Sequence, residues 1–288
     1  MTSSTGQIYS MGCNKYGELG IPDNYKTDVM INEPMQIRLT ARIISTSCGL
    51  NHTLVLTTEG IVYTFGRNDY GQCGYVVSND TYIPRMIDSI EEYNIIMINA
   101  SSYGHGSYCV ADNGIGWRFG TFHTHNVTEY STWPTLLPFP VITIADDDEH
   151  VMIDFDLNSR PAFIPKHNHA DKDDRYFITA VSAGTSHVLF LTLSGEVWCM
   201  GLAQPCLGLG PFMKHHHYID CVACMLLPSH VIANGISCSA DYSFITTTNG
   251  QIYYCGGNQH ILTPLLTNTY HYSNFALGYR IIARSIDQ

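Results

Sequence analysis

The sequence has little charge, few basic residues and no long apolar run. Charged residues make up 14% of its 288 residues, and 14 Lys and Arg face 25 Asp and Glu, which gives a net charge of −11 with His neutral. Phosphate contacts need clustered Lys and Arg, so this balance argues against direct binding of nucleic acid. No stretch is long and apolar enough to cross a bilayer, so we expect no membrane span.

The sequence motifs of common catalytic and targeting devices are missing too. There is no Walker loop, nucleophile elbow or H-E-x-x-H motif. A Ser-His-Asp triad is defined by geometry, so the sequence neither places nor removes one. The opening MTSSTGQIYS lacks the features of a secretory signal. We therefore expect a non-enzymatic cytoplasmic or nuclear protein without a cofactor, whose ten Cys are reduced thiols.

Glycine, tyrosine and apolar residues are abundant instead. The chain has 24 Gly and 19 Tyr, and 45% of its residues are hydrophobic. This composition fits a packed globular protein of many short strands joined by tight turns.

One pattern recurs along the chain: an anchor residue, an apolar strand, a Gly turn and an aromatic strand. The clear copies are CGLNHTLVLTTEGIVYTFG (48–66), AGTSHVLFLTLSGEVWCMG (183–201) and CSADYSFITTTNGQIYYCG (238–256). Their structural anchors are Gly49, His52, Gly60, Gly66, Gly184, His187, Gly195, Gly201, Tyr242, Gly250 and Gly256.

Two further copies are less regular. A fourth copy, SYGHGSYCVADNGIGWRFG, keeps the turn at Gly114 but has Gly106 at the anchor position. A weaker copy follows with His150 as its anchor.

The first residues supply the second half of another copy. GQIYSMGCNKYGELG (6–20) matches GIVYTFGRNDYGQCG (60–74), and both follow the pattern Gly-x-φ-Tyr-x-φ-Gly-x-Asn-x-Tyr-Gly-x-x-Gly, where φ is apolar. Seven fixed identities in one register are a strong signal of repetition.

Each unit is predicted to hold four strands. Short β-forming runs precede the anchors, at 41–47, 93–99, 177–182 and 230–236. The segments at Pro34 and Pro84 could supply an outer fourth strand, because Pro is tolerated at sheet edges.

One such sheet cannot bury both of its faces, whereas several arranged radially can. The sequence therefore predicts an all-β fold, a β-propeller of four-stranded blades that forms a single domain over 1–288. The predicted units are 6–40 with 280–288, 41–92, 93–140, 141–176, 177–229 and 230–279.

The repeat resembles that of the regulator of chromosome condensation family. The resemblance rests on the Gly49-x-x-His52 and Gly184-x-x-His187 steps and on the Asn-x-Tyr-Gly loops that start at Asn14 and Asn68. It implies a β-propeller, commonly of seven blades. Some family members exchange guanine nucleotide on a small GTPase, and the founding member contacts chromatin. The acidic balance of this chain argues against chromatin contact.

Counting units favours six blades. The chain begins in the middle of a repeat and ends with YRIIARSIDQ, which resembles the first strand of a repeat. Pairing of the two ends within one blade would close the ring. Seven blades and an incomplete ring are the open alternatives.

We expect a monomeric propeller that binds another protein through loops on a rigid scaffold. Guanine-nucleotide exchange on a small GTPase is the alternative. The long connections at 20–36, 74–92, 120–140 and 202–229 are the expected contact surfaces. They carry aromatic residues suited to interfaces: Tyr25, Tyr75, Tyr82, Tyr130, Trp133, Phe212 and Tyr218.

The histidines invite a catalytic or metal-binding interpretation, which we do not favour. His52 and His187 recur at an architectural position, so we expect them to hydrogen-bond within the blade. The long loop at 202–229 contains weak candidate ligands for zinc. Structural zinc sites usually pair two ligand sets, and only one set is visible here, so we expect no metal there. These candidates are His215, His217, Cys221 and Cys224.

Overall fold

The structure is a computed structural model, and it describes most of the repeat region. The described residues are 2–3, 5–22, 30–76, 80–102, 104–123, 128–137, 141–142, 153–154, 177–202, 205–209, 218–225, 227–229, 231–257 and 259–265.

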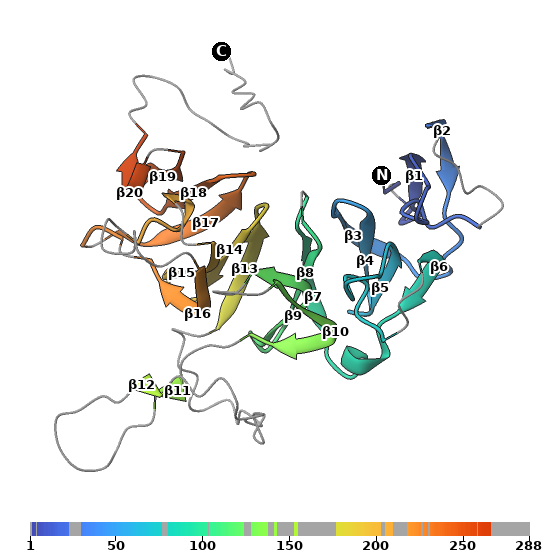
Figure 1. Ribbon diagram of the computed structural model, residues 1–288, viewed down its shortest axis with the longest axis horizontal. Helices are drawn as coiled ribbons and strands as arrows, with labels where there is room; N and C mark the ends of the chain where they lie inside the picture. Colours follow the sequence, from blue (N-terminus) through green and yellow to red (C-terminus); the bar gives the residue numbers. More distant parts are fainter. Residues whose placement is uncertain are drawn as a thin grey trace.

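Four antiparallel sheets of four strands each follow one another along the chain, and in each sheet the strands lie in chain order (Figure 1). Sheet 1 holds β3 (Ile43–Cys48), β4 (His52–Thr57), β5 (Val62–Gly66) and β6 (Thr81–Met86). Sheet 2 holds β7 (Ile95–Ala100), β8 (Gly106–Ala111), β9 (Gly116–His123) and β10 (Thr128–Leu136). Sheet 3 holds β13 (Ile178–Ala183), β14 (His187–Thr192), β15 (Val197–Leu202) and β16 (Tyr218–Cys224). Sheet 4 holds β17 (Ala233–Cys238), β18 (Tyr242–Thr247), β19 (Ile252–Gly256) and β20 (Gln259–Pro264).

Two further strand pairs complete the described elements. β1 (Tyr9–Gly12) and β2 (Ile31–Gln36) form an N-terminal sheet beside sheet 1, whereas β11 (Val141–Ile142) and β12 (Ile153–Asp154) pair apart from the four sheets (Figure 1). The described helices are two short 3₁₀ turns, η2 (Asp88–Ile90) and η3 (Pro205–Leu207). Among the described residues there is no helix with the length and apolarity needed to cross a membrane.

The sheets bury one another's faces, as the sequence predicted. Every residue of β4, β8 and β14 is buried, so both faces of these second strands are covered by neighbouring sheets. Each joint between neighbouring sheets contains one apolar cluster. Leu54, Ile98 and Phe119 belong to the cluster between sheets 1 and 2, and Leu189 and Ile245 to the one between sheets 3 and 4. Stability therefore comes from packing between sheets.

The turn glycine of each unit connects its sheet to the next. The backbone N–H of Ile95, the first residue of sheet 2, donates to the carbonyl of Gly60 at 3.1 Å. A Cβ at Gly60, whose φ is 75°, would strike the side chain of Asn94. Gly6 accepts in the same way from Ile43 at 3.1 Å. The first residues therefore form the second half of a unit.

Sheets 2 and 3 are direct neighbours, although a long segment separates them in the sequence. Ile178 N–H donates to the carbonyl of Gly114 at 3.2 Å, and Ala183 N–H donates to Asn99 Oδ1 at 3.0 Å. The connection between β10 and β13 therefore joins two sheets that are adjacent in space. Apart from β11 and β12, the unit predicted at 141–176 lies outside the described residues.

The successive sheets form an arc, with β1 and β2 at one end and sheet 4 at the other (Figure 1). This arrangement confirms the predicted propeller-like, all-β fold. The strand predicted at 280–288, which was expected to close the ring, lies outside the described residues. The six-blade count and the closure of the ring therefore stay predictions.

The first strands form the inner edges of the four sheets and share one irregularity. β3, β7, β13 and β17 each contain a register shift after their first residue. Such a β-bulge adds a residue that the partner strand does not match. The bulge residues are Ile44, Ile96, Thr179 and Asn234.

Candidate functional site

The anchor histidines join neighbouring sheets. His52, which begins β4, places its Nε2 atom 2.9 Å from Ser107 Oγ in sheet 2. His187, which begins β14, places its Nε2 atom 3.0 Å from Ser243 Oγ in sheet 4. We had expected these histidines to hydrogen-bond within their own blade. Their partners instead lie in the following blade, one residue after its own anchor position.

The serine of each pair fixes the tautomer of the histidine. Ser107 Oγ donates to the carbonyl of Gln72 at 2.8 Å, and Ser243 Oγ donates to the carbonyl of Cys206 at 2.6 Å. A hydroxyl has one proton to donate, so it must accept from the imidazole Nε2–H. Thr53 occupies the same place in sheet 1, where its hydroxyl donates to the carbonyl of Glu18 at 2.9 Å.

Burial keeps both imidazoles neutral. It lowers the pKa of His52 to about 3, with a smaller contribution from the neighbouring His105. Burial likewise lowers the pKa of His187 to about 4. Among the described residues, His52 Nδ1 has no hydrogen-bond partner. A neutral ring bonded through one nitrogen suits a structural role better than proton transfer at neutral pH.

The glycine of the Gly-x-x-His step makes room for the ring. A Cβ at Gly49 would lie 2.8 Å from His52 Nε2 and would overlap the rest of the imidazole. Gly184 is related to His187 in the same way. In the repeats anchored by Gly106 and Tyr242 the corresponding residue is not glycine.

The joint between sheets 2 and 3 lacks this histidine–serine pair and contains a cavity. Gly106 stands where the other units have His or Tyr, and Val188 stands where Ser107 and Ser243 stand. The cavity has a volume of about 330 Å³ and is lined by residues from both sheets. Its walls include Gly106, Tyr108, Thr121, Val188 and Met200.

The Asn-x-Tyr-Gly loop owes its shape to its buried asparagine. Asn68 Oδ1 accepts from Cys73 N–H at 2.9 Å, and its Nδ2 donates to the carbonyl of Tyr75 at 3.0 Å. Asn14 Oδ1 accepts from Leu19 N–H at 3.1 Å in the equivalent N-terminal loop. Each asparagine thereby presents the tyrosine two residues later at the surface.

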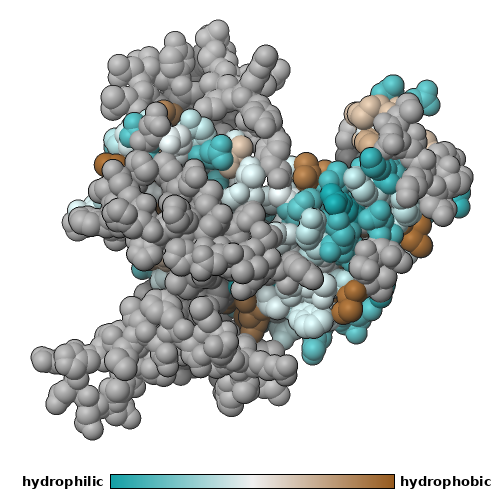
Figure 2. All heavy atoms as spheres, viewed as in Figure 1, coloured by the Kyte–Doolittle hydropathy of each residue, from teal (hydrophilic) through white to brown (hydrophobic). Residues whose placement is uncertain are grey.

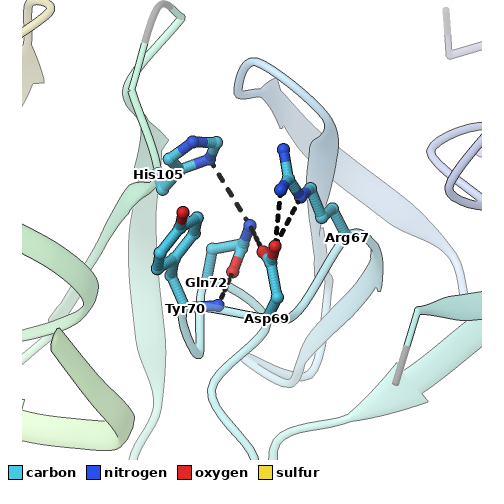
Figure 3. Close-up of polar contacts among 5 residues, drawn as sticks. All are labelled: Arg67, Asp69, Tyr70, Gln72 and His105. Atoms are coloured by element: carbon cyan, nitrogen blue, oxygen red, sulfur yellow. Dashed lines mark hydrogen bonds and ion pairs between the residues drawn. The ribbon is translucent and has the colours of Figure 1, made fainter. Parts of the chain in front are cut away.

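These loops form an aromatic–cation row across three sheets, which consists of Tyr16, Arg67, Tyr70 and His105. The Arg67 guanidinium lies 5.0 Å from the Tyr16 ring centroid and 5.6 Å from that of Tyr70. The Tyr70 and His105 rings stack with their centroids 4.9 Å apart. Figure 3 shows His105 above Tyr70, with Arg67 on the other side of the loop.

Polar contacts hold the aromatic–cation row in place. Arg67 forms an ion pair with Asp69 at 2.5 Å (Figure 3). Gln72 Oε1 accepts from Tyr70 N–H at 2.9 Å, and its Nε2 lies 3.4 Å from His105 Nδ1. Tyr70 is 36% exposed. The row is therefore an ordered surface that solvent reaches.

The aromatic residues that the sequence proposed for partner contact differ in their burial and contacts. Tyr75 is buried, and its hydroxyl donates to the carbonyl of Thr64 at 3.5 Å, so its prediction as a surface contact is corrected to a packing role. Tyr82 donates to the carbonyl of Lys15 at 3.0 Å and thereby links two sheets. Trp133, in β10, is 53% exposed.

The structure does not describe the side chains of the other four aromatic residues proposed for partner contact. Tyr25 and Phe212 lie outside the described residues, and for Tyr130 and Tyr218 the structure describes the backbone alone. Arg67, Tyr70 and His105 were not predicted as surface contact residues from the sequence. The signal was present, because the tyrosine of the Asn-x-Tyr-Gly pattern occurs in both matching loops.

The described residues contain no group of three or more His, Cys, Asp or Glu that could hold a metal ion. Cys224 is half-buried in β16. His215 and His217 lie outside the described residues, as does the side chain of Cys221. The expectation that no zinc binds at this segment therefore stays a prediction.

Comparison with known families identifies the repeats. Two family models match the chain, and both are described as the regulator of chromosome condensation (RCC1) repeat. One matches residues 5–56 and 59–105, and the other matches residues 43–72 and 178–203.

Characterised relatives share part of the chain. The E3 ubiquitin-protein ligase HERC2 of Homo sapiens is 30% identical over 124 residues, which cover 41% of this chain and 2% of HERC2. The ultraviolet-B receptor UVR8 of Arabidopsis thaliana is 28% identical over 151 residues, which cover 51% of this chain and 32% of UVR8. The chain thus spans only a small part of the length of the curated relatives it matches.

Solved structures show the same fold. Human WBSCR16 superposes with a TM-score of 0.68 at 17% identity, over 92% of this chain and 63% of that protein. Prp20p from Saccharomyces cerevisiae, whose crystal structure is described with its binding properties to Gsp1p and histones, superposes with a TM-score of 0.51 at 19% identity, over 96% and 78%.

Proposed function

Because the chain is a protein of regulator of chromosome condensation repeats, we propose that it binds a partner protein through the aromatic–cation row. The role is recognition and not catalysis. The repeats supply a rigid frame, and the loops at one end of the sheets supply the contacts. The observation that carries the proposal is the alignment of Tyr16, Arg67, Tyr70 and His105 across three consecutive sheets.

The chemistry of the aromatic–cation row suits an interface. Tyr and Arg are enriched among residues that dominate binding energy, because they combine large contact area with hydrogen-bonding capacity. Stacking and the Arg67–Asp69 ion pair order these side chains before a partner arrives. Such preorganisation lowers the entropic cost of association.

Among the described residues on the face that Figure 2 shows, no broad apolar patch offers an alternative contact surface. Over β3 to β6 the described residues are mostly hydrophilic, and hydrophobic residues appear there as separate spots (Figure 2). A partner that uses this region would therefore be recognised by specific side chains and not by a continuous apolar patch.

The test compares two variants of the whole chain in affinity capture from native extract. Arg67→Ala/Tyr70→Ala removes the centre of the aromatic–cation row. Glu59→Ala is the control, because Glu59 is exposed in the turn that precedes β5 and the row lies beyond the other end of that strand. We expect a protein retained by the wild type and by Glu59→Ala to be lost at least about fivefold from the double variant. Equal retention by all three proteins would contradict the proposal.

A second measurement separates recognition from nucleotide exchange. Some proteins of this family act on a small GTPase, and the exchange role is the alternative that the sequence raised. The purified chain is added in catalytic amounts to small GTPases loaded with labelled guanine nucleotide. We expect nucleotide release to proceed at its intrinsic rate. Acceleration by catalytic amounts would replace the recognition role with exchange.

A further inference from the structure

The cavity between sheets 2 and 3 lies where the repeat would otherwise place an imidazole. At the joint between sheets 1 and 2, the His52 ring fills the corresponding space and is 1% exposed. Gly106 occupies the equivalent position in sheet 2 and has no side chain. Val188 replaces the serine that would have received the hydrogen bond. The missing ring accounts for a space at this joint.

The chain around the cavity is held in place by other contacts. Ser101 Oγ donates to the carbonyl of Gly184 and joins the two loops beside the cavity. Tyr108 packs edge-on against Phe190, with ring centroids 6.1 Å apart. The stacked Tyr70 and His105 rings, which belong to the aromatic–cation row, also line the cavity. The space is therefore bounded by ordered groups from both sheets.

The lining has hydrogen-bonding groups and no permanent charge. Among the described residues, the buried Thr121 Oγ1 has no hydrogen-bond partner. Thr121 and Tyr108 both line the cavity. Burial raises the pKa of Tyr108 to about 12, so its hydroxyl is a donor at neutral pH. The described lining contains no carboxylate, Lys or Arg, and the Arg118 guanidinium beside it donates to the lining residue Met200 at 3.9 Å, so a neutral ligand is favoured inside the cavity.

We propose that this cavity binds a neutral, planar heteroaromatic ring that carries a hydrogen-bond acceptor. The ring occupies the place of the absent histidine and accepts from the Tyr108 hydroxyl. A cavity of roughly 150 Å³ can hold benzene, so about 330 Å³ is large enough for one ring and a short substituent. The inference concerns a different ligand from the partner of the proposed recognition role, and the two sites share the Tyr70 and His105 rings.

The first experiment uses pyrazole, which is neutral at pH 7 and carries both a ring nitrogen acceptor and an N–H. The ligand is titrated into the whole chain while amide resonances are followed by NMR. We expect saturable shifts at Gly106, Gly184 and Gly201, with a dissociation constant of about 1 mM. Thiophene has a similar size without an acceptor nitrogen, and we expect it to bind at least about fivefold more weakly. No saturable shift at these residues up to ~20 mM pyrazole would overturn the proposal.

Variants show whether the cavity itself is responsible. Tyr108→Phe should weaken pyrazole binding at least about fivefold and leave thiophene binding unchanged. Gly106→Ala should weaken both ligands, because its Cβ would lie 3.2 Å from the Tyr108 hydroxyl and narrow the space. Tyr254→Phe removes a hydroxyl in sheet 4 and is the control. If Tyr108→Phe does not fold, Thr121→Val takes its place. Equal pyrazole binding by all variants would overturn the proposal.

Two sources could supply the same ring, a free small molecule or a histidine side chain of a partner protein. N-acetylhistidine amide and 4-methylimidazole are compared at about pH 8, where most imidazole is neutral. Binding of either supports the ring class. Tighter binding of the amide assigns the site to a partner's side chain, and tighter binding of 4-methylimidazole assigns it to a small molecule. Failure of both, together with pyrazole, overturns the proposal without bearing on the Arg67→Ala/Tyr70→Ala capture experiment.

Discussion

The imidazole of His187 in sheet 3 donates to the hydroxyl of Ser243 in sheet 4 across 3.0 Å, and Ser243 donates back to the carbonyl of Cys206 in η3, which follows β15 of sheet 3. His52 and Ser107 repeat this relationship between sheets 1 and 2. The serine therefore bridges two groups of the preceding unit. The Gly-x-x-His step thus provides a connection between blades as well as a turn within one.

Removing one of these serines should loosen a joint. Ser107→Ala leaves the buried His52 Nε2–H and the Gln72 carbonyl without their partner. A buried group without its hydrogen bond costs about 1–3 kcal/mol. We expect a loss of that size in the free energy of unfolding, measured by urea denaturation. Ser89→Ala, at an exposed position in η2, should change it by less than about 0.5 kcal/mol. Equal effects of the two changes would contradict the bridging role.

A glycine substitution tests the packing of the histidine ring. Gly49→Ala places a methyl group against the His52 imidazole and should destabilise the protein by about 1–3 kcal/mol. His52→Ala removes the ring, so a second Gly49→Ala change should then cost much less. A double-mutant cycle of unfolding free energies measures this coupling. Additive effects would show that Gly49 is required for a reason other than the ring.

Acid should weaken the fold through the same two histidines. Their pKa values are lowered to about 3 for His52 and about 4 for His187, whereas an unfolded histidine titrates near ~6.5. The unfolded state therefore takes up protons first as the pH falls. The stabilisation is present above pH ~6.5 and is lost between that value and the folded pKa values. At about pH 5 the loss is ~2 kcal/mol for each histidine.

Urea denaturation between about pH 7.5 and pH 5 measures this loss. The comparison is His52→Gln/His187→Gln, in which neither position can titrate. The double variant is expected to be less stable at neutral pH because the joints are disturbed, but its stability should fall less with acid. A pH dependence equal to that of the wild type would show that the two imidazoles do not remain neutral in the fold.

The cysteines should differ sharply in reactivity. Burial raises the pKa of Cys73 to about 12 and that of Cys238 to about 12, which keeps both as unreactive thiols. Cys48, at the end of β3, is exposed. We expect Cys48 to react with a thiol reagent at once in the native protein, and Cys73 and Cys238 to react only after denaturation. Peptide mapping of the labelled sites checks the order, and Cys48→Ser should remove the rapid phase at that site. Rapid labelling of Cys73 in the native state would contradict its burial.

The connection between sheets 2 and 3 should tolerate replacement. Leu137 N–H donates to the carbonyl of Gly116, and Ile178 N–H donates to that of Gly114, so both ends of the connection are fixed to one hairpin. Replacing residues 141–174 with a short Gly-Ser linker should leave the melting temperature within a few degrees of the wild type. Deleting β16 and its flanking loops removes a strand of sheet 3 and is the disruptive control. Unfolding of the linker variant would show that the replaced segment is needed for the fold.

The fold could be predicted from the sequence because both the turn glycines and the β-forming runs before the anchors recur in every clear copy of the repeat. The turn glycines at Gly60, Gly195 and Gly250 fixed the hairpins, and the strands before each anchor lie within two or three residues of their predicted positions. The unit predicted at 141–176 from the alternating apolar residues around His150 lies almost wholly outside the described residues and stays a prediction. Periodicity describes local chain behaviour and does not show which sheet a segment can join.

The candidate site was harder to predict, because it depends on contacts across joints. The sequence marked His52 and His187 as structural, but it could not show that their partners are Ser107 and Ser243, about 55 positions away. Gly106 was recognised as an irregular anchor. Its consequence, a cavity opposite Val188, depends on which sheets are neighbours, and that order became visible only in the fold.

The bulge at the second residue of β3, β7, β13 and β17 bears on how the protein stays apart from its own copies. These strands are sheet edges, and an unbroken edge offers a ready template for pairing with a foreign strand. An unmatched residue interrupts the ladder at the same point in each sheet, where Ile44 and Ile96 stand exposed. The repeated irregularity thus interrupts, at the same point in each sheet, the regular hydrogen-bond ladder that an added strand would need.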